Sequence, residues 1–145
     1  FFVISDLICV SAPVGIFFGR ISNFINGELF GRPSNFLIGM KFPNADSQYR
    51  HPSQLYEAFL EGLLLFIILN FLIFKFKKLK NPGIISGVFL MLYGLFRFTV
   101  EFTREPDIQL GFVYHFFTMG MILSLPMFLA GILILVIKSI KNDTR

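Results

Sequence analysis

The sequence contains few of the residues from which many metal and catalytic sites are built. Its 145 residues include one cysteine and two histidines. The cysteine, Cys9, lies in an apolar run, which excludes an intrachain disulfide framework and gives no metal-ligand spacing, so we expect a small buried hydrophobic residue. No phosphate-binding loop, dinucleotide motif, Ser-His-Asp order, CxxC or HExxH is present. We therefore expect no metal and no cofactor.

Charged residues are also scarce, and apolar ones are abundant. Charged residues make up 15% of the chain, apolar residues 54%, and there are 21 phenylalanines. The mean hydropathy of +0.70 exceeds what a soluble domain of this length carries. The net charge of +4 could suggest nucleic acid, but the lysines fall in two short clusters beside apolar segments. Membrane topology explains such clusters better, so we predict a polytopic membrane protein without a nucleic-acid partner.

The chain starts with Phe-Phe and opens directly into an apolar segment. It has neither the basic n-region nor the small-residue cleavage site of a signal peptide. We expect the sequence to be incomplete at its N-terminus.

Four apolar segments approach the roughly 20 helical residues that a bilayer requires. They lie at about 1–19, 55–74, 84–102 and 116–137. The predicted fold class is therefore all-α, a single transmembrane domain over 1–145 that forms a polytopic membrane helix bundle of about four spans.

Basic residues predict the orientation of this bundle. Seven of the 13 lie in 75–83 and in the tail 138–145, and the positive-inside rule makes these segments cytoplasmic. The loops 20–54 and 103–115 then face outward. The unusual polar residues share this outer side, and they are Arg20, Asn23, Glu28, His51, Glu57, Glu61, Tyr93, Arg97 and Glu101.

A polar stripe follows the third span, because Tyr93, Arg97 and Glu101 are spaced four apart. An arginine within a span is costly unless it faces a partner or a polar cavity, which indicates function. The alternatives are an internal Arg97–Glu101 pair or snorkelling toward the outer interface. A fixed cation near the headgroups suits a phosphate ester.

Two glutamates open the second span. Glu57 and Glu61 share one helix face and should point into the bundle, protonated or paired with a cation. His51 precedes Pro52, and at such a position a cap or surface histidine is more common than a catalytic base.

The stretch GRISNFINGELFGRPS, residues 19–34, combines charge, amides and glycines. A plain loop would explain the Asn26-Gly27 turn dipeptide. Against this, Arg20 and Asn23 are a turn apart, and Gly27 and Gly31 would let backbone approach a ligand closely. Charge, amide donors and bare backbone together favour binding of a phosphoglycerol headgroup.

Three stretches together resemble the bacterial prolipoprotein diacylglyceryl transferases. They are GRISNFINGELFGR, RHPSQLYEAFLEG and YGLFRFTVEFTREPD, in the order and spacing of that family, followed by MGMILSLPMFLAG. The first matches the family hallmark almost residue for residue, with Ser22 where a glycine is commoner. Family members are nearly twice this length, with about seven spans. Their N-terminal half carries a histidine that neither His51 nor His115 matches.

The resemblance implies a multi-pass enzyme of the bacterial inner membrane. It would transfer the diacylglyceryl group of phosphatidylglycerol to the lipobox cysteine thiol of prolipoproteins. A thioether forms and glycerol 1-phosphate leaves, in the first step of lipoprotein maturation. The active site would face the periplasmic side, and the C-terminus would be cytoplasmic.

The resemblance also implies roles for individual residues. Arg20 and Arg97 match the essential arginines and become the expected catalytic phosphate ligands. The other expected substrate-binding residues are Asn23, Glu28, Gly31, Tyr93 and Glu101, with the two glutamates orienting the arginines. A transporter or flippase subunit that binds headgroups without chemistry is the alternative, although no internal repeat supports it. A membrane scaffold would leave the polar stripe unexplained.

Overall fold

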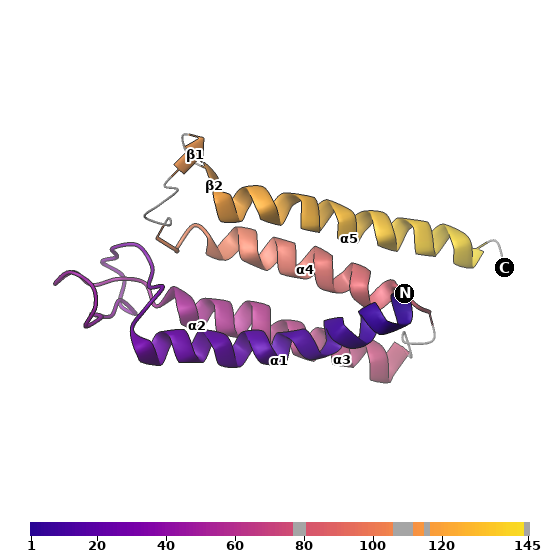
Figure 1. Ribbon diagram of the computed structural model, residues 1–145, viewed down its shortest axis with the longest axis horizontal. Helices are drawn as coiled ribbons and strands as arrows, with labels where there is room; N and C mark the ends of the chain where they lie inside the picture. Colours follow the sequence, from indigo (N-terminus) through magenta and orange to yellow (C-terminus); the bar gives the residue numbers. More distant parts are fainter. Residues whose placement is uncertain (77–80, 106–111, 115–116, 144–145) are drawn as a thin grey trace.

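The chain folds into a bundle of long helices with irregular segments gathered at one end (Figure 1). The computed structural model describes residues 1–76, 81–105, 112–114 and 117–143. Its elements are α1 (Phe2–Asn26), α2 (Ser53–Glu57), the π-helical η1 (Ala58–Leu64), α3 (Leu65–Phe76), α4 (Ile84–Val100), β1 (Phe112–Tyr114), β2 (Phe117–Thr118) and α5 (Met119–Asp143). The two short strands pair antiparallel just before α5.

Four rods run alternately up and down the bundle: α1, the continuous helix α2–η1–α3, α4 and α5 (Figure 1). Three of them are long and apolar enough to cross a membrane, at Phe2–Asn26, Ser53–Phe76 and Met119–Ile140, and α4 is a shorter apolar helix. Apolar side chains such as Leu7, Ile67 and Leu133 are exposed on the outside, where lipid would solvate them. The prediction of an all-α membrane bundle is confirmed.

The first helix is longer than predicted. It ends at Asn26 instead of near residue 19, so Arg20 and Asn23 lie on a helix and not in a loop. Nothing before the Asn26-Gly27 dipeptide breaks the helix. Gly27 then closes it in the left-handed conformation, with φ 66° and ψ 33°, and donates its N–H to the carbonyls of Asn23 and Phe24.

The packed centre of the bundle is small. Leu65, Leu69 and Ile85 are fully buried, and half-buried side chains including Cys9 and Tyr93 pack around them. On the other side of α4, glycines allow a close approach to α5: a Cβ atom on Gly131 would lie 2.4 Å from the backbone nitrogen of Met91. These contacts fix α4 between α1 and α5.

Asp6, the acidic residue of α1, caps the start of α4. Its buried carboxylate accepts the backbone N–H of Gly83 at 2.7 Å and that of Ser86 at 2.8 Å, and the Ser86 hydroxyl donates to it as well. An N-terminal helix turn leaves such N–H groups without partners in its own helix. A carboxylate from α1 therefore links α1 to α4 at the end of the bundle opposite the loop 27–52.

The predicted basic segments fall partly outside the described residues. Lys77, Lys78 and Lys80 of the 75–83 loop lie there, and so do His115 and most of the predicted 103–115 loop. The described ends of both basic segments lie at the same end of the bundle, away from the loop 27–52 (Figure 1).

Candidate functional site

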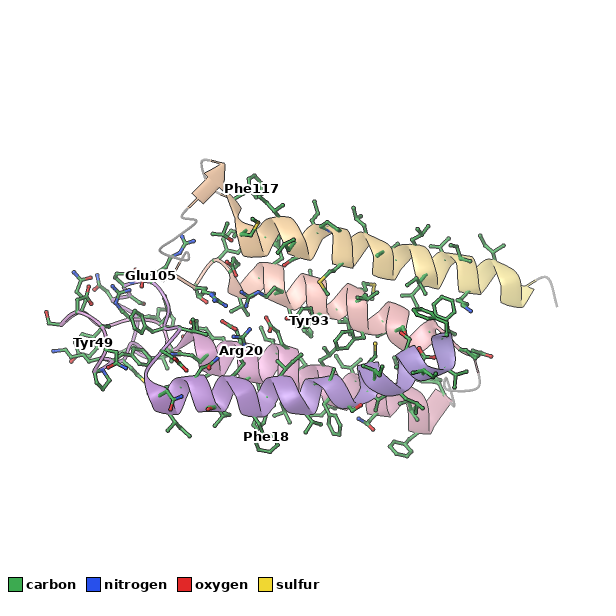
Figure 2. The ribbon with its side chains drawn as sticks, viewed as in Figure 1. Phe18, Arg20, Tyr49, Tyr93, Glu105 and Phe117 are labelled. Carbon is green, nitrogen blue, oxygen red and sulfur yellow. The ribbon has the colours of Figure 1, made fainter. Side chains whose placement is uncertain are left out.

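Four ionic side chains from three rods meet inside the loop-bearing half of the bundle. Arg20 comes from α1, Glu57 and Glu61 from the start of the second rod, and Arg97 from the last turns of α4. Figure 2 shows Arg20 and Tyr93 in the space between α1 and α4. The predicted convergence of these residues at one end is confirmed.

Glu57 is the hub of this cluster. A single oxygen, Oε2, lies 2.7 Å from Arg20 Nε, 3.1 Å from Arg97 Nη1 and 3.7 Å from Arg104 Nη1. The Glu57 side chain is 1% exposed, so these contacts are screened little by solvent. One carboxylate oxygen thus joins α1, α4 and the segment after α4.

Glu61 lies beside this hub but is held more loosely. Its Oε1 is 3.6 Å from Arg97 Nη1, and its Oε2 is 3.9 Å from Arg20 Nη2. Both oxygens are buried, and neither has a hydrogen bond to any residue that the structure describes. The prediction that Glu57 and Glu61 point into the bundle beside cations is confirmed.

The second rod is π-helical where its two glutamates lie. Glu57 closes α2, and Glu61 lies within η1. Residues four apart share one face of a helix, and π-turns often occur at functional sites. Gly62 lies against Phe17, where an added Cβ would be 2.7 Å from the phenylalanine Cβ, so α1 approaches η1 closely here.

Glu101 holds Arg97 from the other side. Its Oε2 lies 3.1 Å from Arg97 Nη2, and its Oε1 accepts the Thr118 hydroxyl at 2.8 Å. The internal Arg97–Glu101 pair, considered as an alternative to function, is present, but Arg97 also reaches Glu57 on another rod. Arg97 therefore lies within salt-bridge distance of three carboxylates, those of Glu57, Glu61 and Glu101.

An open pocket lies beside Arg20. It has a volume of about 230 Å³ and is lined by Ile16, Gly19, Arg20, Asn23 and Tyr93. The side chains of Arg20 and Arg97 are 20% and 15% exposed, so neither side chain is fully buried. The pocket offers a guanidinium, an amide and a phenol to a ligand.

Two residues of the predicted site lie away from this cluster. Glu28 is exposed and accepts the Asn26 side-chain amide at 3.3 Å; within the described part of the chain it forms no ion pair with Arg20. Gly31 donates its N–H to the His51 carbonyl at 2.9 Å. A Cβ on Gly31 would lie 2.4 Å from the Thr103 carbonyl oxygen. The backbone of Gly31 thus approaches other backbone segments of the protein.

His51 has the structural role that is more common for a histidine before a proline. Its Nδ1 lies 3.4 Å from the Tyr56 hydroxyl, and its backbone carbonyl accepts N–H groups from Gly31 and Ser53. The residue therefore organises the start of α2. No contact joins it to Arg20 or Arg97 among the residues that the structure describes.

Arg50 connects several loop segments, a role that the sequence alone does not indicate. Its guanidinium donates to both carboxylate oxygens of Asp46 at 3.0 Å, to the Gly31 carbonyl at 3.2 Å and to Glu105, and it lies over the ring of Phe30. The hydrogen bond to Arg50 holds the pKa of Asp46 below its usual range, and that bond raises the pKa of Arg50. A lone arginine before His-Pro gave no signal beyond its charge.

Comparisons with known proteins place these residues in a family. The family model of prolipoprotein diacylglyceryl transferase matches residues 1–137. The chain belongs to this family. Among similar proteins, the phosphatidylglycerol–prolipoprotein diacylglyceryl transferase of Rickettsia bellii (strain OSU 85-389) is 51% identical over 145 residues, covering all of this chain and 55% of the relative. That of Rickettsia africae (strain ESF-5) is 58% identical over 131 residues, covering 90% and 51%.

The chain thus spans about half the length of the curated transferases that it matches. The three transferase-like stretches fold as the end of α1 with the following loop, the start of the second rod, and the end of α4. Each stretch contributes a charged residue to the Glu57 hub: Arg20, Glu57 itself and Arg97. The sequence features that carried the resemblance are therefore the ones that meet in space.

Proposed function

We propose that this chain forms the headgroup-binding part of a phosphatidylglycerol–prolipoprotein diacylglyceryl transferase. Membership in a transferase family supports this over a non-catalytic transporter or flippase subunit. Arg20 and Arg97 bind the phosphate, Asn23 and Tyr93 donate hydrogen bonds from the pocket wall, and Glu101 orients Arg97. Glu28 and Gly31 stay predictions that rest on the family resemblance.

The observation that supports this proposal most strongly is the pairing of two arginines across the bundle. Arg20 and Arg97 come from different rods and meet at one carboxylate oxygen, with Nε and Nη1 at 2.7 and 3.1 Å. Each guanidinium has five N–H donors, more than these contacts use. A phosphate between them could accept charge-assisted hydrogen bonds from both.

The proposed reaction needs this kind of cationic site. A lipobox cysteine loses its proton to become a thiolate, which attacks the diacylglyceryl carbon that carries the phosphate. The new carbon–sulfur bond forms a thioether as the carbon–oxygen bond breaks, and the electron pair of the carbon–oxygen bond leaves with glycerol 1-phosphate. The proton lost by the thiol passes to solvent or to the released phosphate. Negative charge grows on the leaving phosphate, where preorganised arginines stabilise it most.

The arrangement of the bundle supports a periplasmic active site. The cluster and the loop 27–52 lie in one half, and the C-terminal ends of α3 and α5, which include Lys75 and Lys138, lie at the other end (Figure 1). Under the positive-inside rule the lysine-bearing end and the C-terminus are cytoplasmic. The two arginines would then lie near the outer headgroups, where phosphatidylglycerol and the lipobox of an exported prolipoprotein meet.

A transfer assay tests the proposal. The protein encoded by the whole reading frame that contains this chain is purified in detergent, and transfer of labelled diacylglyceryl from phosphatidylglycerol to a lipobox peptide is measured. We expect Arg20→Ala and Arg97→Ala each to lower kcat/KM by about a hundredfold or more. Lys41→Ala removes one exposed positive charge from the loop 27–52 and should leave kcat/KM unchanged. Near-normal turnover of either arginine variant rules out its role as a phosphate ligand.

A further inference from the structure

We infer that Glu57 is a positioning residue that sets the spacing between the Arg20 and Arg97 guanidinium groups, so that both can bind one phosphate. The inference rests on the proposed headgroup site and adds a residue to it. Glu57 is 1% exposed and does not line the pocket, so it acts on a ligand only through the arginines.

The contacts of Glu57 suit this role. Its Oε2 lies within salt-bridge distance of arginines from α1, α4 and the segment after α4, the shortest contact being the 2.7 Å bond to Arg20 Nε. The Arg97 Nη1 bond at 3.1 Å has hydrogen-bonding geometry as well. Guanidinium groups repel each other, so a shared anion between them is what keeps two of them close.

Glu61 provides a contrast within the same cluster. It is as buried as Glu57, lies four residues along the chain and faces the same two arginines. Its contacts are nevertheless longer, at 3.6 and 3.9 Å, and within the described part of the chain neither of its oxygens has a hydrogen bond. Glu61 therefore adds negative charge to the cluster while fixing the arginines less closely than Glu57 does.

A simpler role for Glu57 would be to neutralise charge. Arg20, Arg97 and Arg104 carry three positive charges, balanced by the three carboxylates of Glu57, Glu61 and Glu101. If neutralisation were the whole role, removal of either Glu57 or Glu61 charge would strengthen anion binding. Positioning makes the opposite prediction for Glu57, because the arginines lose the oxygen that spaces them.

Two substitutions at Glu57 separate charge from geometry. Glu57→Gln keeps the shape and removes the charge, whereas Glu57→Asp keeps the charge and retracts the carboxylate by one methylene. Glu61→Gln is the matched control, because it makes the same chemical change four residues along the helix. The protein from the whole reading frame is titrated with short-chain dihexanoyl phosphatidylglycerol in detergent by calorimetry, with dihexanoyl phosphatidylcholine and glycerol 1-phosphate as separate ligands.

We expect both Glu57 variants to bind dihexanoyl phosphatidylglycerol about tenfold more weakly or worse, which is the scale of one hydrogen bond to a charged group. Glu61→Gln should bind it as tightly as the unmodified protein or more tightly. Comparison with glycerol 1-phosphate shows whether the phosphate alone or the whole lipid headgroup is recognised. In the transfer assay the Glu57 variants should show a raised KM together with a lowered kcat.

Several results would overturn the inference. It fails if Glu57→Gln and Glu61→Gln both tighten binding, if Glu57→Asp binds normally, or if the unmodified protein does not distinguish phosphatidylglycerol from phosphatidylcholine. It also fails if neither Glu57 variant elutes as a folded particle, because Glu57 would then hold the bundle together. A protein that binds as expected but transfers nothing contradicts the proposed transferase activity and leaves the positioning role supported.

Discussion

Gly120 lies directly against the carboxylate of Glu101: a Cβ atom on Gly120 would be 2.5 Å from Glu101 Cδ and 2.6 Å from both carboxylate oxygens. The contact joins the first turn of α5 to the residue that caps the C-terminus of α4. Since the same carboxylate binds Arg97 at 3.1 Å, the small size of Gly120 lets Glu101 reach its arginine. A residue with no functional group thereby influences the proposed phosphate site.

The substitution Gly120→Ala should displace Glu101 and weaken its bonds to Arg97 and Thr118. We expect transfer activity to fall by about tenfold or more, because misplacing a site group by a fraction of an ångström is costly. Gly15→Ala is the matched control, since a Cβ there meets nothing within 4 Å and alanine favours a helix. Equal activity of the two variants would show that Glu101 does not depend on Gly120.

Asp6 gives a prediction about stability that is separate from the site. Asp6→Asn keeps the size of the side chain but turns an NH₂ group toward the N–H donors of Gly83 and Ser86. We expect the free energy of unfolding in detergent to fall by about 1–3 kcal/mol, the scale of a lost cap with an unsatisfied buried donor. Thermal unfolding, monitored by circular dichroism, measures this change in the free energy of unfolding, and the exposed substitution Ser11→Ala is the control. An unchanged transition would show that the cap contributes nothing.

The anchor at Arg50 gives a prediction about pH. The pKa of Asp46 is lowered by its bonds to Arg50, so its contribution to stability is fully present above its ordinary pKa of about 4 and is lost as pH falls through the lower folded value. Arg50 stays charged throughout, because Asp46 raises its pKa. Hydrogen exchange at the Met40–Arg50 backbone pair, corrected for intrinsic rates, should accelerate between pH 5 and pH 3.

A matched variant checks the source of this pH dependence. Asp46→Asn cannot ionise, so its exchange at the same amides should already be faster at pH 6 and should change less with acid. The bond between Arg50 and Glu105 remains in that variant and limits the effect to partial loosening. Equal pH profiles for both proteins would assign the acid response to another group.

The sequence carried enough information to predict the bundle and the members of the charged cluster. Hydropathy marked the spans, and the cost of burying Glu57, Glu61 and Arg97 in a membrane required them to face inward toward partners. The predicted end of α1 is too early, because the polar side chains of Arg20 and Asn23 are typical of a loop. Both residues line the pocket, and the helix continues past them to Gly27, which closes it in the left-handed conformation.

The pairings within the site could not be predicted from spacing. Spacing along α4 indicated the Arg97–Glu101 pair, but the use of one Glu57 oxygen by three arginines depends on how three rods pack. The same limit applies to Arg50, whose partners Asp46 and Glu105 are separated by 59 positions in the chain. Long-range contacts of this kind have no periodic signal.

The most direct measurement is solid-state NMR of the distance between the lipid phosphorus and the arginine nitrogens. The protein, with ¹⁵N-labelled arginine guanidinium groups, is placed in a bilayer of phosphorus-free glycolipid that contains one phosphatidylglycerol per protein, and dephasing of the ³¹P signal by ¹⁵N is recorded. We expect clear dephasing from hydrogen-bond contact, and a smaller effect in both Arg20→Lys and Arg97→Lys, with Lys41→Ala unchanged. Dephasing that is absent, or that persists in full in both arginine variants, would contradict a phosphate held between Arg20 and Arg97.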